Sequence, residues 1–206
     1  GDPNDIREDV PAQYVLDVLA RTRLSTQEMF DAFDHCKKNG VLPLCTPWDL
    51  PSVSALEEYG VDAYKTSSAD LTNHDLIDAV AQTGKPMLVS TGMSTEAEIE
   101  ETVALLKGQG ADFVLLHSNA TYPTPFKDIN LNYLDRLRAI GDCPVGYSGH
   151  ERGFHVPLAA VALGARVIEK HITTDKKMEG NDHKISLLPV EFKAMVEGIR
   201  QIEDSI

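Results

Sequence analysis

Hydroxyl, ammonium and imidazole side chains stand at the ends of six short apolar runs, which recur about every twenty to thirty residues. The runs are Leu42–Thr46, Ala63–Lys65, Met87–Ser90, Phe113–His117, Val145–His150 and Val167–His171. A (β/α) barrel builds its active site from residues at the carboxyl ends of successive strands. Ammonium and hydroxyl groups bind anions and neutral imidazole binds metals, so this set suits an anionic substrate beside a metal ion.

Three histidines end the last three runs, and they are the candidate metal ligands: His117, His150 and His171. A single strand-end histidine is more often structural, but neighbouring strands bring their ends close together, which favours a shared site. Asp182 lies in the polar segment after the last run and could supply a carboxylate near the ion. A polar surface loop explains that segment equally well.

Lys65 ends an apolar run and is the candidate anion-binding cation. As a point charge it could bind phosphate or carboxylate, and a Schiff base with a carbonyl substrate is the less favoured alternative. Hydroxyl groups at other run ends could complete the anion site; they belong to Thr46, Ser68, Ser90 and Ser148.

Helical patterns separate most of these runs. Capping boxes at Ser25–Glu28 and Thr95–Glu98 predict two helix starts, and the strand–helix alternation predicts a parallel sheet. The fold class is therefore α/β, a TIM (β/α)8 barrel represented by about six β/α units, strands 3–8 of the barrel. No linker interrupts the chain, so we predict one incomplete barrel domain over residues 1–206.

Composition excludes several classes of protein. The net charge is −13, from 32 acidic and 19 basic residues, which argues against a nucleic-acid partner. No apolar stretch approaches the roughly 18 residues of a membrane span. The three cysteines form no CxxC motif, so a reducing cytoplasm is the expected compartment.

Taken together, the motifs resemble one family, the sialic acid synthases: N-acetylneuraminate synthases with their legionaminate, pseudaminate and spore-coat polysaccharide relatives. The matching segments are Tyr64–Asp70, Ser90–Met93, Leu115–His117, Tyr122–Pro125, Gly146–His150, Ala160–Ala165, Glu169–His171 and Gly180–His183. The resemblance implies a TIM barrel that condenses phosphoenolpyruvate with an N-acetylated amino sugar aldehyde, N-acetylmannosamine or a 6-deoxy-diacetamido hexose. The products are a nonulosonic acid and phosphate, and a homodimer is expected.

The resemblance also implies roles for individual residues. His150 and His171 would ligate a divalent metal, Mn²⁺ or Mg²⁺, whereas His117 is not the usual ligand. Asp182 would serve the metal water or the sugar, and with the two ligands and Lys65 it forms the expected catalytic set. The phosphoenolpyruvate contacts would be Thr46, Lys65, Ser68, Ser90, Ser148 and Asn119, and the sugar contacts would be Asp70, Tyr122 and Asp182.

The chain departs from this family in several places. Gly149 and Asn181 replace the usual aspartate and proline, and Ala120 stands where an asparagine is usual, with Asn119 beside it. The glutamate and lysine-x-glutamine motif of the first two strands and the C-terminal antifreeze-like domain are missing, so we expect weak or no activity. Two alternatives remain: an inactive fragment or paralogue that binds sugar or phosphate ligands, and a metal-dependent TIM-barrel hydrolase.

Overall fold

The computed structural model describes residues 12–180 and 182–206. The chain divides into two compact units, one ending at Pro43 and one running from Leu44 to Ile206. The single domain expected over residues 1–206 remains a prediction, and each unit is described by itself. Asn181, one of the departures from the resembled family, lies outside the described residues.

The first unit contains two helices, α1 (Ala12–Thr22) and α2 (Thr26–Lys38). The capping box predicted for α2 is confirmed. The Ser25 hydroxyl accepts the Glu28 amide at 3.3 Å, and the Glu28 carboxylate accepts the Ser25 amide at 2.8 Å. These two contacts satisfy amide groups that have no partner inside the helix, which is why the helix begins here.

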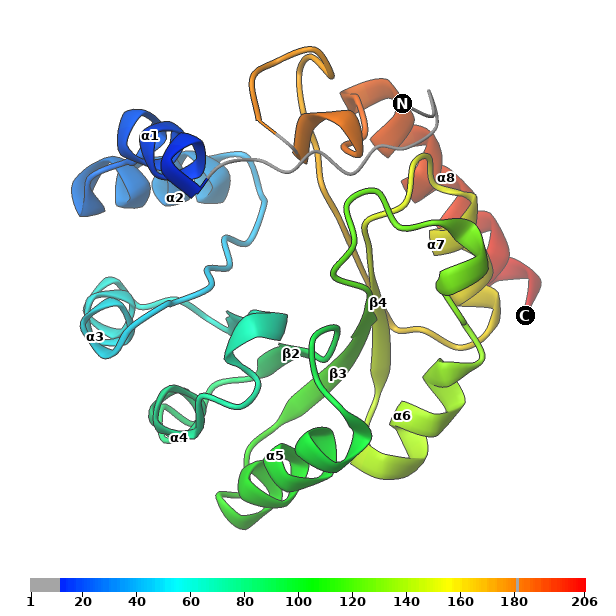
Figure 1. Cartoon of the computed structure of the whole chain (residues 1–206), viewed down its shortest axis with the longest axis horizontal. Helices are drawn as coiled ribbons and strands as arrows, with labels where there is room; N and C mark the ends of the chain where they lie inside the picture. Colours follow the sequence, from blue (N-terminus) through cyan, green and yellow to red (C-terminus); the bar gives the residue numbers. More distant parts are fainter. Residues whose placement is uncertain (1–11, 181) are drawn as a thin grey trace. The chain divides into compact units, whose positions relative to one another are not determined.

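The second unit is built on five parallel strands in sequence order, which form a half-barrel (Figure 1). They are β1 (Tyr64–Thr66), β2 (Met87–Ser90), β3 (Phe113–Ser118), β4 (Val145–Gly149) and β5 (Val167–Lys170). The predicted α/β fold with a parallel sheet is therefore confirmed. Because all five strands run the same way, their carboxyl ends share one edge of the sheet.

In the described part of this unit, one α-helix precedes the first strand, four connect the strands and one follows the last strand, and they lie around the outside of the sheet (Figure 1). They are α3 (Leu50–Tyr59), α4 (His74–Ala81), α5 (Glu96–Gly108), α6 (Tyr133–Gly141), α7 (His155–Ala162) and α8 (Pro189–Ser205). The second predicted capping box is confirmed at the start of α5, where Thr95 and Glu98 cap each other's amides. No helix in the described ranges has the length and apolarity needed to cross a membrane.

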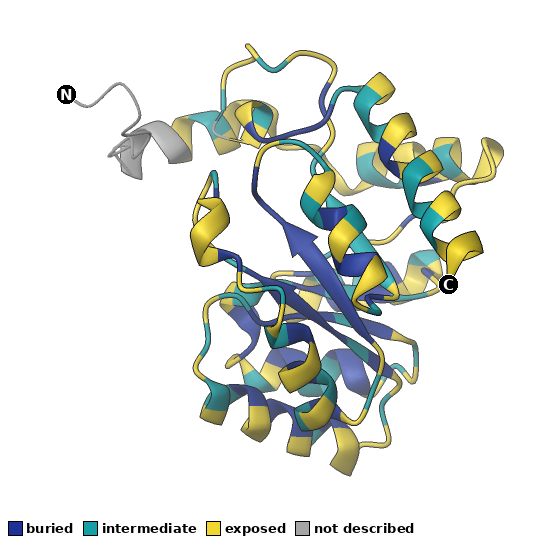
Figure 2. Cartoon of the chain, turned by 90° about the vertical axis from the view of Figure 1, so that its right-hand side faces the viewer, coloured by how far each residue is buried: buried dark blue, intermediate teal, exposed yellow. Residues whose placement is uncertain are grey.

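The core lies between the strands and the inward faces of the helices, as Figure 2 shows by the dark blue strands and the yellow outer faces of the helices. Its largest fully buried side chains include Tyr64, Met87, Leu115, Leu116 and Leu137. Strands buried on both faces need nearly continuous apolar sequence, and this explains why the runs read as unbroken rather than alternating. The polar exceptions lie toward the carboxyl ends of the strands.

The first apolar run differs from the prediction. Within Leu42–Thr46 only Cys45 pairs with the sheet, as an isolated parallel bridge to Tyr64. Pro43 has no amide to donate, and the boundary between the two units falls directly after it. The sheet therefore has five strands where the sequence predicted six.

Candidate active site

Two imidazoles lie together at the carboxyl edge of the sheet. His150 follows β4 and His171 follows β5, and their ring centroids are 5.4 Å apart at an interplanar angle of 66°. The Tyr122 ring stacks on His150 with centroids 4.0 Å apart and meets His171 edge-on at 5.9 Å. The structure thus brings together the two histidines predicted as ligands and the tyrosine predicted as a sugar contact.

Hydrogen bonds fix the tautomer of His150. Its Nδ1 lies 2.7 Å from the Asn119 carbonyl, which can only accept, so Nδ1 carries the proton. Nε2 therefore holds an electron pair and accepts the Tyr122 hydroxyl at 2.9 Å. Burial lowers the pKa of His150, which keeps the ring neutral at pH 7. A neutral imidazole with its other nitrogen hydrogen-bonded to a carbonyl is the usual form of a metal ligand.

Asp182 lies beside the second imidazole. Its Oδ2 is 3.8 Å from Nδ1 of His171, and its side chain is 61% exposed, so solvent and substrate can reach it. Burial, together with the Asp182 and Glu169 carboxylates, raises the pKa of Tyr122 to about 12. Tyr122 is thus a hydrogen-bond donor, and not a phenolate, at neutral pH.

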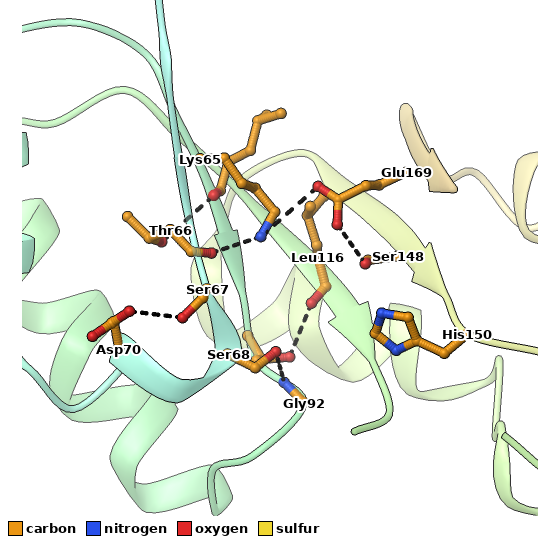
Figure 3. Close-up of polar contacts among 12 residues, drawn as sticks. Lys65, Thr66, Ser67, Ser68, Asp70, Gly92, Leu116, Ser148, His150 and Glu169 are labelled. Atoms are coloured by element: carbon orange, nitrogen blue, oxygen red, sulfur yellow. Dashed lines mark hydrogen bonds and ion pairs between the residues drawn. The ribbon is translucent and has the colours of Figure 1, made fainter. Parts of the chain in front are cut away.

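Lys65, on β1, faces a carboxylate from the far strand of the sheet. Its Nζ donates to the Thr66 carbonyl at 2.7 Å and lies 3.8 Å from Oε2 of Glu169 on β5. The other Glu169 oxygen accepts the Ser148 hydroxyl at 2.7 Å. Burial lowers the pKa of Lys65, an effect that the Glu169 carboxylate opposes. Figure 3 shows Lys65, Glu169 and Ser148 pointing toward one another, with His150 nearby.

The Ser90 hydroxyl, at the end of β2, is buried and has no hydrogen-bond partner among the described residues. Ser68 begins the short 3-10 helix Ser68–Asp70 that follows β1, and its hydroxyl accepts the Gly92 amide at 3.0 Å (Figure 3). A Cβ at Gly92 would lie 2.9 Å from the Ser118 carbonyl carbon and oxygen, so only glycine fits there. Buried polar groups are nearly always paired, so the Ser90 hydroxyl is placed to bond a polar group from outside the described residues.

Two predicted ligands are engaged within their own loops. The side-chain nitrogen of Asn119 donates to the Asp128 carbonyl at 3.3 Å, and its side-chain oxygen accepts the Thr121 backbone amide at 3.0 Å. The Asp70 carboxylate accepts the Ser67 hydroxyl at 2.7 Å (Figure 3) and the Asn73 amide group at 3.3 Å. Both side chains hold loops at the edge that carries the imidazoles, and their substrate contacts remain predictions.

The remaining predicted residues are placed as follows. The Cys45 carbonyl accepts the Lys65 amide at 3.1 Å. Thr46 directly follows Cys45, so Thr46 lies next to β1. His117 is buried, and its Nε2 donates to the Ile129 carbonyl at 2.6 Å. That bond accounts for His117 as a structural residue, in keeping with its exclusion from the metal ligands.

The donor groups fit a divalent cation held by two imidazoles. In residues 12–180 and 182–206, no three or more His, Cys, Asp or Glu side chains form a cluster that could hold a metal ion. A cation at this edge would therefore have only two of these side chains as ligands, and His150 and His171 are the two that lie together. The Nε2 lone pair of His150 is the observation that supports a metal here, because the Asn119 carbonyl fixes it in the ligating tautomer.

Sequence reasoning assigned no role to three charged residues at this edge, Glu151, Glu169 and Lys170. Glu169 contacts both Lys65 and Ser148, while Glu151 and Lys170 form a fully buried ion pair with Nζ and Oε1 2.8 Å apart. In the sequence they could have been recognised by their position: Glu151 directly follows His150, and Glu169 and Lys170 directly precede His171. Their pairing joins positions about twenty residues or more apart, which no local pattern shows.

Comparison with known proteins identifies the family that the chain matches and its similar proteins. A family model described as the NeuB family matches residues 3–206. An uncharacterized protein of Methanocaldococcus jannaschii is 48% identical over 181 residues, which are 87% of this chain and 54% of that protein. An N,N'-diacetyllegionaminic acid synthase of Campylobacter jejuni is 39% identical over 207 residues, 99% of this chain and 62% of that protein. The chain thus spans little more than half the length of these relatives.

A solved structure agrees with these matches. It is an N-acetylneuraminic acid (sialic acid) synthetase from Leptospira borgpetersenii in complex with citrate, with a TM-score of 0.90 and 32% sequence identity. The match covers 94% of this chain and 68% of that one. The half-barrel therefore has a counterpart in the fold of a sialic acid synthetase.

Proposed function

We propose, from the premise that this chain belongs to the NeuB family, that it provides the synthase site of a nonulosonic acid synthase. The reaction would join phosphoenolpyruvate to an N-acetylated amino sugar aldehyde and release phosphate. The names of the relatives, legionaminic acid synthase and sialic acid synthetase, support this reaction class. The observation that supports it most is that one edge of the sheet holds the Lys65 ammonium and the Ser90 and Ser148 hydroxyls as well as a pair of imidazoles.

The anion site would bind phosphoenolpyruvate. Lys65 would supply a largely buried positive charge, and Ser90 would supply a buried hydroxyl that has no partner among the described residues. Ser148 would complete the set by turning its hydroxyl from Glu169 to the substrate. Because these groups come from three strands of one sheet, they would orient the enol phosphate with only the Ser148 hydroxyl turning, which lowers the barrier to reaction. Thr46, Ser68 and Asn119 are proposed as further contacts.

His150 and His171 would hold a Mn²⁺ or Mg²⁺ ion. When bound, the ion supplies Lewis-acid polarisation of the sugar aldehyde. The Asn119 carbonyl contributes by keeping the His150 proton on Nδ1, so that Nε2 stays available as a ligand. The hydroxyl of Tyr122 would pass from Nε2 to the sugar, and Asp70 is the second proposed sugar contact.

The proposed bond changes balance within the two substrates and water. C3 of phosphoenolpyruvate would bond to the aldehyde carbon with the electrons of its C2–C3 double bond, and the aldehyde oxygen would take up the first proton that the water loses. Water would add to C2, and phosphate would leave with the electrons of its bond to C2 while the new C2 hydroxyl becomes a carbonyl and gives its proton to the phosphate. Asp182 would accept the proton of the attacking water, a role that suits its exposed carboxylate. Lys65 would offset the anionic charge of the phosphoenolpyruvate and keep the ester aligned as phosphate departs.

Calorimetry with phosphoenolpyruvate tests the anion site directly. We expect Lys65→Met to lower affinity at least tenfold, because a buried charged partner is lost. Lys85→Met is the matched control, since Lys85 pairs with Glu57 at 2.6 Å and carries the same charge elsewhere on the unit. Equal affinity of the two variants would remove Lys65 from the anion site.

Turnover is tested by phosphate release that requires an added amino sugar. We expect release with Mn²⁺ present and its loss in His150→Ala, with His35→Ala on α2 as the control. Phosphoenolpyruvate binding without sugar-dependent release would favour the binding-only alternative. Release that does not depend on sugar would favour a hydrolase.

We also propose a cytoplasmic location and a homodimeric whole protein. The location is supported by the three cysteines, none of which forms a disulfide. The dimer is supported by the resemblance to the family, and sedimentation analysis would test it.

A further inference from the structure

A fully buried ion pair connects the two elements that carry the imidazoles. Glu151 directly follows His150, and Lys170 directly precedes His171. Nζ of Lys170 lies 2.8 Å from Oε1 of Glu151, and both side chains are 0% exposed. The ammonium also donates to the Glu151 backbone carbonyl, and Tyr147 donates its hydroxyl to Oε2 of Glu151 at 2.6 Å. Both carboxylate oxygens are therefore satisfied.

The pair acts where the strand ladder stops. The last paired residues of β4 and β5 are Gly149 and Lys170, so His150 and His171 both lie just beyond the ladder. The bonds from Lys170 to the Glu151 backbone and carboxylate extend the connection between the two strands past this point. They fix the main chain on the far side of His150 and on the near side of His171.

Gly149, two residues before Glu151, leaves space for the Glu151 carboxylate. A Cβ at position 149 would lie 2.6 Å from Oε2 of Glu151 and 2.7 Å from Cε1 of Tyr147. Glycine is thus the residue that leaves room for the carboxylate between Tyr147 and the main chain. The fit shows that the ion pair is built into the end of β4 and is not an incidental surface contact.

Stability alone is a poor explanation for such a pair. The cost of desolvating two charges commonly cancels their attraction, and a well-packed apolar pair is often as stable. Buried charged groups can instead fix the orientation of the residues that carry them, because their hydrogen bonds hold one geometry. That geometry is needed here by the two imidazoles, whose centroids are 5.4 Å apart.

We propose that Glu151 and Lys170 are positioning residues that fix the spacing and orientation of His150 and His171. Neither touches the cation; each acts through the imidazole next to it in the chain. A divalent cation bound by both rings gains affinity because the rings need not be reoriented. This inference rests on the proposed function for the role of the imidazoles as ligands.

The test measures Mn²⁺ binding by electron paramagnetic resonance in the 206-residue protein, with Mn²⁺ as the only added ligand. We expect Lys170→Met to weaken Mn²⁺ binding 10- to 100-fold, the usual effect of losing a group that orients a ligand. Lys85→Met is the matched control and should bind like the wild type, since its ion pair with Glu57 lies at α3 and the start of β2. Equal Mn²⁺ affinity of folded Lys170→Met and wild type overturns the inference.

A second variant separates positioning from folding. Glu151→Gln/Lys170→Met removes both buried charges, so it should recover the stability lost in Lys170→Met while its Mn²⁺ affinity stays low. Glu151→Gln, which keeps the size of the side chain and an acceptor for Tyr147, serves if Lys170→Met does not fold. Recovery of Mn²⁺ affinity together with stability would show a purely structural role and overturn the proposal.

Nuclear magnetic resonance spectra of the metal-free protein distinguish this inference from the proposed function. We expect Lys170→Met to move the imidazole resonances of His150 and His171 and to weaken the cross-peaks between them, while Lys85→Met leaves both unchanged. If the wild type binds no Mn²⁺, the metal role in the proposed function fails. The resonances then decide the positioning inference alone: a change supports it and identical spectra overturn it.

Discussion

Replacing Ser90 with alanine should stabilise the protein while weakening the binding of its proposed anionic substrate. The Ser90 hydroxyl is buried and lacks a hydrogen-bond partner among the described residues. A buried unpaired hydroxyl costs about 1–3 kcal/mol, and the contacts of one lost oxygen are worth only a few tenths of a kcal/mol. We therefore expect Ser90→Ala to raise the free energy of unfolding by about 1 kcal/mol.

Thr102→Val is the matched control for a buried hydroxyl that has a partner. Thr102 is 0% exposed and donates to the Leu71 carbonyl at 2.9 Å. Its replacement removes that hydrogen bond and the contact of the hydroxyl with His74 Nε2 at 3.3 Å, so we expect a loss of roughly 0.5–1.5 kcal/mol. Urea denaturation of the three proteins, with equal m-values, measures both changes.

Adding phosphoenolpyruvate should reverse the order of wild type and Ser90→Ala. At 100 times its dissociation constant a ligand stabilises a protein by about 2.7 kcal/mol, and a tenfold loss of affinity reduces this to about 1.4 kcal/mol. Thr102→Val should gain as much as the wild type does. The reasoning is refuted if Ser90→Ala loses stability as Thr102→Val does, or if it gains the full ligand increment.

Two further predictions follow from buried positions. Gly92→Ala should lower the free energy of unfolding by about 1–3 kcal/mol, since the new Cβ would lie 2.9 Å from the Ser118 carbonyl; denaturation unchanged within 0.5 kcal/mol would contradict the close approach. Burial lowers the pKa of His117 below its ordinary value of 6.5. As the pH falls, the unfolded chain therefore takes up a proton at this histidine before the folded protein does. The free energy of unfolding should thus decrease as the pH drops through about 6.5. Urea denaturation at about pH 7.5 and pH 5 should therefore show a smaller pH difference in His117→Gln than in wild type; because the pKa of His150 is also lowered, only the difference between the two proteins reports on His117.

Much of the fold could be predicted because it follows from contacts between near neighbours. The capping boxes at Ser25 and Thr95 join residues three apart, and both are present in the structure. The alternation of strands and helices predicted the parallel sheet for the same reason. The Leu42–Thr46 run shows the limit, because strand pairing depends on a partner elsewhere and only Cys45 found one.

The candidate site was predictable as a set of strand ends, since parallel strands place their carboxyl ends together. The bonds within it were not. Gly149, a departure from the resembled family, gains a reason only from the Glu151 carboxylate that lies where its Cβ would be. Asn119 was predicted as a substrate contact, yet its carbonyl also sets the tautomer of His150.

The sequence by itself determined the helices and their caps, the parallel order of the strands, and which side chains stand at the strand ends, because these depend on short-range patterns of polarity and hydrogen bonding. Only the tertiary structure decided which of these side chains meet. Lys65 and Glu169 come from opposite ends of the five-stranded sheet, and the Glu151–Lys170 pair spans a whole helical crossover. Such contacts are fixed by the curvature of the sheet, which brings together residues that are far apart in the chain.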